Sequence, residues 1–298
     1  QPGVTNLEIS VAAAPHGLYY APDPSSQVAC TIGGNVAENS GGVHCLKHGL
    51  TVHNLLELRV LTIDGELLVL GSETGEAPGL PLLALLTGSE GMLGVVVEAT
   101  VRLKPLPERV ELLMVAFDDV RRCADAVGRI IASGIVPAGL EMMDAPAMRA
   151  AEAFARCGYP TEADALLLCE LDGLHHDVER DLQAIETLLR DCGASSLRVA
   201  ADAAERQRMW SGRKSAFPAV GRLAPDYFCM DGTIPRRHLA DVLQRIGELS
   251  QAAGLPVANV FHAGDGNLHP LILFDAGEPG AIERAEHLGA EILELCVA

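Results

Sequence analysis

The sequence predicts an α+β protein built from two domains. Its 298 residues exceed the usual size of one domain, and a hydrophobic fraction of 49% is enough to fill two cores. Up to about residue 104 the chain is rich in glycine and proline, whereas clear helical periods alternate with strands beyond that point. We therefore expect one domain over 1–104 and another over 105–298, with the boundary at Pro105 and Pro107.

Short strand-like runs separated by glycine-laced loops characterise the first domain. These runs cover residues 57–63, 66–70 and 95–103. In the second domain, three capped amphipathic helices are predicted, and they end at Gly134, Gly193 and Gly254. Six strand-like runs lie around them, at 112–117, 140–143, 165–171, 227–233, 257–261 and 268–274. The last two runs indicate a hairpin, but the pattern does not decide between parallel and antiparallel pairing elsewhere.

Charge and apolar patterning exclude several classes of protein. The formal net charge is -18 and no Lys/Arg cluster is present, which argues against nucleic acid as a partner. No apolar run is long enough to cross a bilayer, and no signal segment opens the chain. The eight cysteines are scattered without a CxxC pair, which fits reduced thiols. We expect a cytoplasmic protein.

The two ends of the chain lack the usual boundary signals. The sequence begins at Gln1 without an initiator Met, and it stops at Ala298 inside an apolar helical pattern without a cap residue. We expect a segment that is truncated at both ends, although disordered ends would give the same appearance.

Two glycine-rich segments in the first domain are candidates for ligand binding. They are Ile32-Gly-Gly-Asn-Val-Ala-Glu-Asn-Ser-Gly-Gly42 and Gly88-Ser-Glu-Gly-Met-Leu-Gly-Val95. Where side chains are nearly absent, backbone N–H groups can approach an anion closely. Neither segment has the Walker A or Rossmann pattern. From spacing alone, one extended ligand and ordinary turns remain open as explanations.

The most specific local pattern is His262-Ala-Gly-Asp-Gly-Asn-Leu-His269. Asp265-Gly266 favours a tight reversal, so a loop over 264–267 would pair His262 with His269 on one face of a hairpin. Two such imidazoles can chelate a divalent cation, although a third ligand has to come from elsewhere. A hairpin with two incidental histidines remains the alternative.

A third pattern, Trp210-Ser-Gly-Arg213, follows a polar helical stretch. An arginine can bind a carboxylate with two parallel hydrogen bonds. Most surface arginines have no such role, so this pattern alone leaves both interpretations open.

Together these motifs resemble the vanillyl-alcohol-oxidase type of FAD enzymes. The resemblance spans essentially the whole chain and also includes Tyr19-Tyr-Ala-Pro-Asp-Pro24, Gly139-Leu-Glu-Met-Met-Asp144 and Asp231-Gly-Thr-Ile-Pro235. It lies in the branch of the D-lactate and D-2-hydroxyglutarate dehydrogenases and is closest to the flavin subunits of bacterial glycolate oxidase. The resemblance implies the C-terminal part of an FAD-binding domain over 1–104, then a cap domain over 105–298. In the cap we expect helices on one face of a largely antiparallel sheet.

The resemblance also implies site residues and cofactors. Arg213 would bind the substrate carboxylate, and His262 and His269 would ligate a divalent metal such as Zn, Mn or Fe. The implied activity is oxidation of a small 2-hydroxy acid, glycolate or D-lactate, with hydride transfer to FAD. The residues that would line the flavin are Pro22, Gly33, Gly34, Asn35, Asn39, Gly42, Gly49, Gly91, Gly94 and Val95.

Departures from the family pattern limit this interpretation. The N-terminal phosphate loop and the C-terminal Glu-His-Gly motif, which would supply the third metal ligand and the base, are missing. The base is therefore expected outside this chain, and the segment alone is expected to be inactive. The Thr and Lys of the hydroxyglutarate enzymes fall at Phe217 and Cys229, which disfavours a dicarboxylate.

The implied partners are a related flavin subunit and an iron–sulfur subunit of an oxidase complex, with peripheral attachment to the inner membrane through them. The alternative is a non-catalytic flavin-fold subunit that serves assembly or electron relay. A relay subunit has no need of a metal-binding hairpin, so His262 and His269 favour the enzyme.

Overall fold

The computed structural model describes residues 1–72, 74 and 79–298. These residues form two compact units, residues 1–107 and residues 108–298, and each is described by itself. No helix in the described part of the chain combines the length and the apolar character that a membrane-spanning segment needs. All eight cysteines are free thiols in the structure.

The first unit is organised around a three-stranded antiparallel sheet with the order β3-β2-β4. Its strands are β2 (Leu55–Leu61), β3 (Leu67–Gly71) and β4 (Val95–Val101), which confirms the three predicted runs. The remaining elements are α1 (Asn6–Ala13), α2 (Ile32–Glu38), α3 (Cys45–His48), α4 (Leu82–Leu86), and the short pair β1 (Leu18–Tyr19) and β5 (Lys104–Pro105). Because β5 pairs with β1, residues 104–105 lie with the first unit.

Packing between α2 and the sheet forms the core of the first unit. Val36 of α2 is fully buried against Leu58 and Val60 of β2. The hairpin between β2 and β3 closes at Gly65, whose φ of 79° lies in the left-handed region that favours glycine. This arrangement fixes the glycine-rich start of α2 beside the start of β4.

The second unit contains one large antiparallel sheet with the order β10-β13-β12-β7-β8-β6-β9, and β11 pairs with β13. The fold class predicted from the sequence, α+β with a largely antiparallel sheet, is confirmed. The strands are β6 (Arg109–Phe117), β7 (Gly139–Asp144), β8 (Ala165–Gly173), β9 (Ser196–Val199), β10 (Asp226–Cys229), β11 (Gly232–Thr233), β12 (Val257–His262) and β13 (Asn267–Phe274).

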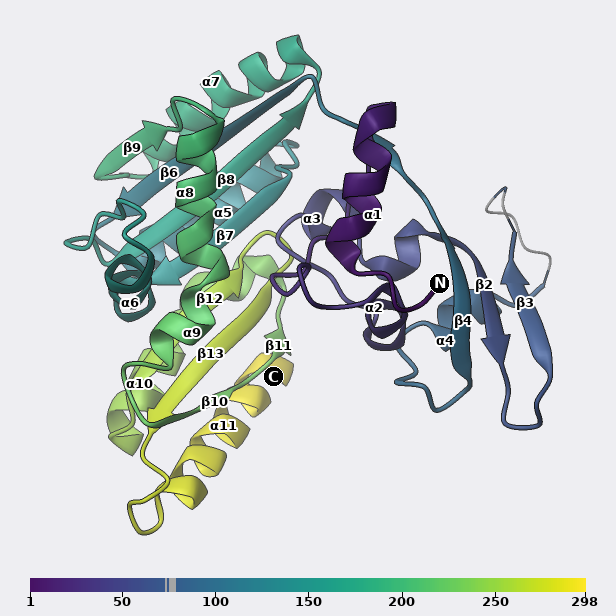
Figure 1. Ribbon diagram of the computed structural model, residues 1–298. Helices are drawn as coiled ribbons and strands as arrows, with labels where there is room; N and C mark the ends of the chain where they lie inside the picture. Colours follow the sequence, from purple (N-terminus) through teal and green to yellow (C-terminus); the bar gives the residue numbers. More distant parts are fainter. Residues whose placement is uncertain (73, 75–78) are drawn as a thin grey trace. The chain divides into compact units, whose positions relative to one another are not determined.

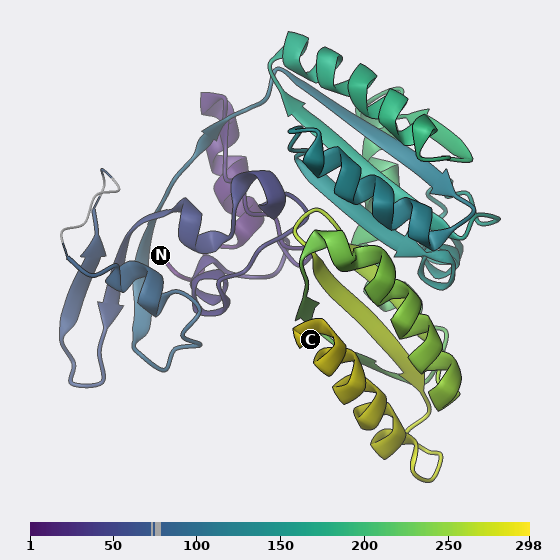
Figure 2. The same ribbon diagram turned by 180° about the vertical axis from the view of Figure 1, so that it is seen from behind.

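Helices cover both faces of this sheet, so the expectation of a single covered face was wrong. Figure 1 shows α8 and α9 in front of the sheet, and Figure 2, from behind, shows α5, α7, α10 and α11 over the opposite face. The physical reason is visible in β7, where all six residues are buried and neither face alternates with solvent. The helices are α5 (Val120–Ala132), α6 (Ala145–Ala155), α7 (His175–Asp191), α8 (Ala203–Lys214), α9 (Ala216–Val220), α10 (Leu239–Ala253) and α11 (Ala281–Val297).

The hairpin between β12 and β13 forms as predicted, but its register differs. His262 pairs with Asn267, and His269 pairs with Val260. The loop therefore covers residues 263–266 instead of 264–267, because Gly266 adopts a φ of 81° and its N–H donates to the carbonyl of His262. The shift is two residues, an even number, so both histidines still lie on the same face of the sheet.

Candidate active site

A buried glutamate on β7 lies at the centre of the polar cluster in the second unit. Oε1 of Glu141 lies 2.9 Å from Nδ1 of His262, and Oε2 lies 2.6 Å from Nη2 of Arg213. The side chains of Glu141 and Arg213 are each only 2% exposed. One carboxylate thus contacts residues from α8 and β12, which are far apart in the sequence.

Glu141 lies within the run Gly139–Asp144 that carries part of the family resemblance, but no role was predicted for it from the sequence. The available signal was a charged residue within an apolar strand, between Leu140 and Met142. A buried carboxylate needs a partner to offset its desolvation, so its presence in such a strand indicates nearby donors.

Arg213 reaches the cluster because α8 packs tightly against its neighbours. The N-cap of this helix is Asp202, whose side chain accepts a hydrogen bond from the N–H of Glu205. A Cβ on Gly212 would lie 2.6 Å from the ring of Tyr159, so only glycine allows this close approach. One turn before Arg213, Nε1 of Trp210 donates to Glu170 on β8 at 2.5 Å. The inner side of α8 therefore presents polar groups to the sheet.

The guanidinium of Arg213 retains donors that are not satisfied within the described residues. Nε and Nη2 have no hydrogen-bond partner there, and neither has Oε2 of Glu141. The 2.6 Å contact is thus a close charge pair whose alignment is poor for a hydrogen bond. Buried polar groups are usually paired, so this guanidinium is suited to gain a partner from an anionic ligand.

The rings of His262 and His269 lie next to each other, with centroids 5.1 Å apart and an interplanar angle of 85°. Burial lowers the pKa of His262, but the charge and hydrogen bond of Glu141 outweigh it, so the pKa lies above its ordinary value. Burial and the neighbouring His262 lower the pKa of His269 to about 4. His269 is consequently neutral near pH 7, the form in which imidazole binds metals.

Each of these histidines has its Nδ1 directed to a carboxylate. The partner of His262 is Glu141, and Nδ1 of His269 lies 3.6 Å from Oδ1 of Asp231. Carboxylates in this position are typical of histidines that ligate metals through the other nitrogen. Within residues 1–72, 74 and 79–298, however, no group of three or more His, Cys, Asp or Glu side chains could hold a metal ion.

Two further residues singled out from the sequence lie near the histidines. The ring of Phe217, on α9, meets that of His269 edge-on at a centroid distance of 5.8 Å. Cys229, on β10, pairs with Leu271 of β13, two residues beyond His269 and on the same face. Both positions therefore belong to the surroundings of the histidine pair.

The first unit contains an open groove of about 440 Å³ lined mostly by small residues. Five residues expected to line the flavin, Gly33, Gly34, Gly91, Gly94 and Val95, lie on it. The N–H of Gly33 donates to the carbonyl of Pro2, and the N–H of Gly34 donates to the side chain of Thr31. These two N–H groups, which were expected to face an anion, are therefore already hydrogen-bonded within the chain. The lining of this groove is nearly free of large side chains.

The remaining expected flavin residues lie away from the lining of this groove. Asn35 is buried on α2, and its Nδ2 has no partner within the described residues. Asn39 ends α2 in the left-handed region, and its Oδ1 accepts from the N–H of Val52. Close packing explains Gly42, because a Cβ there would lie 2.6 Å from the backbone of Asp23. Turn geometry explains Gly49, whose φ of 77° lies in the left-handed region. The carbonyl of Pro22 accepts from Asn6.

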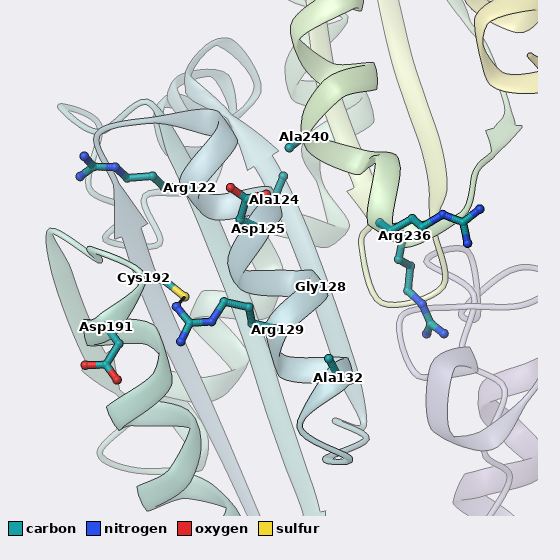
Figure 3. A pocket seen from close by; sticks show the side chains of 11 residues that line it. Arg122, Ala124, Asp125, Gly128, Arg129, Ala132, Asp191, Cys192, Arg236 and Ala240 are labelled. Atoms are coloured by element: carbon teal, nitrogen blue, oxygen red, sulfur yellow. Dashed lines mark hydrogen bonds between the residues drawn. The ribbon is translucent and has the colours of Figure 1, made fainter.

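A second groove, of about 560 Å³, lies on the face of the second unit opposite to His262 and His269. Figure 3 shows Arg122 and Arg129 on α5, Asp191 and Cys192 at the end of α7, and Arg236 and Ala240 across the groove. None of the site residues predicted from the sequence lines it.

Comparison with known proteins identifies the family. Residues 106–298 match the family described as FAD linked oxidases, C-terminal domain, and residues 1–71 match the FAD binding domain. The chain belongs to the FAD-linked oxidases. The polar cluster around Glu141 lies within the C-terminal domain of this family, and the α2 part of the glycine-lined groove lies within the FAD binding domain.

Curated relatives of this FAD-linked oxidase include glycolate oxidase subunits. The chain is 64% identical over 297 residues to glycolate oxidase subunit GlcD of Escherichia coli (strain K12), covering 100% of the chain and 60% of the relative. It is 38% identical to the subunit of the same name from Bacillus subtilis (strain 168), with 100% and 63% covered. A D-lactate dehydrogenase of Anaerostipes hadrus is 32% identical, with 90% and 58% covered. The chain thus spans about three fifths of the length of these relatives.

Solved structures support the same fold. Alkyldihydroxyacetonephosphate synthase matches with a TM-score of 0.77 at 19% identity, covering 100% of this chain and 58% of that one. P-cresol methylhydroxylase with substrate bound matches with a TM-score of 0.73 at 16% identity, covering 99% and 65%. At these identities the likeness concerns the fold alone.

Proposed function

We propose that this chain is part of a flavin-dependent oxidase or dehydrogenase of a small 2-hydroxy acid, glycolate or D-lactate. The observation that carries the proposal is Arg213, a buried guanidinium with unsatisfied donors in the same cluster as His262. The identity to glycolate oxidase subunits and D-lactate dehydrogenases supports this substrate class. The first unit then supplies part of the flavin site, and the second acts as the substrate domain.

Arg213 has the role of binding the substrate carboxylate. A guanidinium offers parallel donors that match a carboxylate in geometry, and its burial strengthens the charge-assisted contact. Phe217 supports a short substrate, because its apolar ring beside His269 offers no donor for a second carboxylate. Glycolate and D-lactate therefore fit a site bordered by Phe217 better than a dicarboxylate does.

His262 and His269 are proposed to hold a divalent cation, Zn, Mn or Fe. Support comes from their adjacent rings and from the carboxylates that face both Nδ1 atoms. Two ligands from the chain are fewer than such a site usually needs, so a further ligand has to come from outside the described residues. When bound, FAD accepts the hydride of the substrate α-carbon, and the cation supplies positive charge for the substrate oxygens.

The residues of the chain then bind and orient the substrate. Arg213 binds the substrate carboxylate. Because Glu141 contacts both Arg213 and His262, the histidine pair lies close to this arginine. We assign the base that removes the hydroxyl proton to no residue within 1–298. The Glu-His-Gly motif implied by the family would supply that base from beyond this chain.

We also propose that the whole protein works in a complex and is located in the cytoplasm. The relative from Escherichia coli is described as a subunit, which supports partner subunits for this protein. A related flavin subunit and an iron–sulfur subunit would receive electrons from the reduced flavin, with peripheral attachment to the inner membrane through them.

Steady-state turnover of the full-length protein tests the proposed function. The full-length protein, with its flavin content measured, is assayed with glycolate, D-lactate and D-2-hydroxyglutarate and an artificial electron acceptor. We expect turnover with at least one of the two short acids and a much lower kcat/KM with the dicarboxylate. A flavin-loaded protein without turnover on either short acid would contradict the proposal.

A further inference from the structure

We propose that Glu141 is a positioning residue that serves both halves of this site with a single carboxylate. One oxygen orients His262 toward a metal ion, and the other holds Arg213 for the substrate carboxylate. This inference rests on the proposed function and assigns a role to a residue that contacts neither metal nor substrate itself.

The first half of the argument concerns the tautomer of His262. A carboxylate only accepts hydrogen bonds, so at 2.9 Å the Nδ1 atom of His262 is the donor to Oε1 of Glu141. In the neutral ring Nε2 then carries the lone pair, and it is the nitrogen left to ligate a metal. A carboxylate that accepts a hydrogen bond from the other ring nitrogen fixes the orientation of a metal-binding histidine and raises its basicity.

The second half concerns Arg213. Oε2 of Glu141 lies 2.6 Å from Nη2, and both side chains are almost fully buried. An arginine side chain has several rotatable bonds, and a buried positive charge without a partner is strongly unfavourable. The nearby carboxylate therefore keeps the guanidinium at this place before substrate binds.

The sheet topology explains why one residue can serve both purposes. Strands β7 and β12 are adjacent, with Val260 paired to Met143, so Glu141 and His262 share a face. Helix α8 lies on that same face and brings Arg213 onto it. A glutamate on β7 thus connects an element that presents a candidate metal ligand with an element that presents the substrate arginine.

A purely structural role would not favour this residue. An apolar side chain of similar volume would avoid the desolvation of this buried ion pair. Replacement of buried ion pairs by apolar residues is often neutral or stabilising. The charge at this position is therefore explained by the site that it organises.

The test uses the full-length protein with the substitution Glu141→Gln. We expect the Kd for Mn²⁺ or Zn²⁺, measured by competition with a chelator in the absence of substrate, to rise by roughly 10- to 100-fold. We also expect KM for the preferred short acid to rise in the same variant, while flavin content stays unchanged. Both changes are needed, because the inference assigns both functions to one carboxylate.

The matched control is Asp144→Asn. Asp144 lies on the same strand and is also buried, but three residues away and thus on the opposite face, where it contacts Asn259. We expect this variant to leave the metal Kd and KM unchanged. If Glu141→Gln does not fold, Glu141→Asp takes its place, since it keeps the charge and shortens the reach; the same two changes are expected.

The outcomes separate this inference from the proposed function. If the wild-type protein binds a divalent cation and oxidises a short acid, but the Glu141 variants change the metal Kd and KM by less than about two-fold, the inference is overturned and the function stands. Equal effects of the Asp144 and Glu141 variants would show a merely structural role and also overturn it. A wild-type protein with neither metal binding nor turnover would overturn the proposed function and this inference with it.

Discussion

The ring of Phe217 meets the ring of His269 edge-on, with their centroids 5.8 Å apart. An apolar residue thus borders the histidine pair, and under the proposed function it offers no donor to a second substrate carboxylate. We predict that Phe217→Thr combined with Cys229→Lys raises the ratio of kcat/KM for D-2-hydroxyglutarate over glycolate by about 10-fold or more. Phe217→Leu serves as the control, because it removes the ring without adding a donor. An unchanged ratio in the double variant would contradict this account of substrate length.

Substitution of Arg213 tests the proposed carboxylate contact. Loss of a charge-assisted contact removes about 2 to 3 kcal/mol, so Arg213→Ala should lower kcat/KM by roughly 30- to 150-fold and raise KM. The substitution also leaves Glu141 buried without a positive partner, which costs about 3 to 5 kcal/mol of stability. Arg213→Lys keeps the charge and provides a variant that folds more readily. A kcat/KM within about two-fold of wild type in both variants would exclude the role.

Metal analysis of His262→Ala and His269→Ala tests the proposed cation site. We predict that either substitution in the full-length protein removes most of the bound divalent cation and most of the turnover. Flavin content should remain unchanged, because both histidines belong to the second unit and the glycine-lined groove belongs to the first. Unchanged metal content in both variants would remove this site from the account.

The pH dependence of stability tests the burial of Asp144. Burial raises the pKa of this carboxyl to about 6, above the ordinary value of 3.8. Between these two values the folded state binds more protons than the unfolded state, so the unfolding free energy falls as pH rises through this window. We predict that the Tm of the wild type, relative to Asp144→Asn, decreases from pH ~4 to ~6.5 and changes little at higher pH. A Tm difference between the wild type and Asp144→Asn that is independent of pH would contradict the raised pKa of Asp144.

Much of the fold could be predicted from sequence because its signals are local. The strands at 57–63 and 66–70, and the helices that end at Gly134, Gly193 and Gly254, are visible as periodicity and caps. The covering of both sheet faces was missed because α8, which lies on the second face, is a polar helix with little apolar periodicity. Tertiary burial, not local pattern, determines that strand β7 has no solvent face.

The candidate site shows the same division between local and long-range information. The turn at Asp265-Gly266 was predictable, but its exact register depends on the left-handed φ of Gly266 and on the carbonyl of that glycine accepting from Ile234. Glu141 could not be assigned from the sequence, because its partners His262 and Arg213 are 121 and 72 residues away along the chain. Only the three-dimensional pairing of β7, β12 and α8 brings them together.

Anaerobic reduction of the flavin tests the central claim most directly. The full-length protein with bound FAD is mixed with glycolate or D-lactate in the absence of oxygen and of any other electron acceptor, and the visible absorption of the oxidised flavin is followed. We predict that the absorption is bleached by at least one of these acids and that Arg213→Ala strongly slows the bleaching. A flavin that dithionite reduces, but that neither acid reduces in the wild-type protein, would contradict the account.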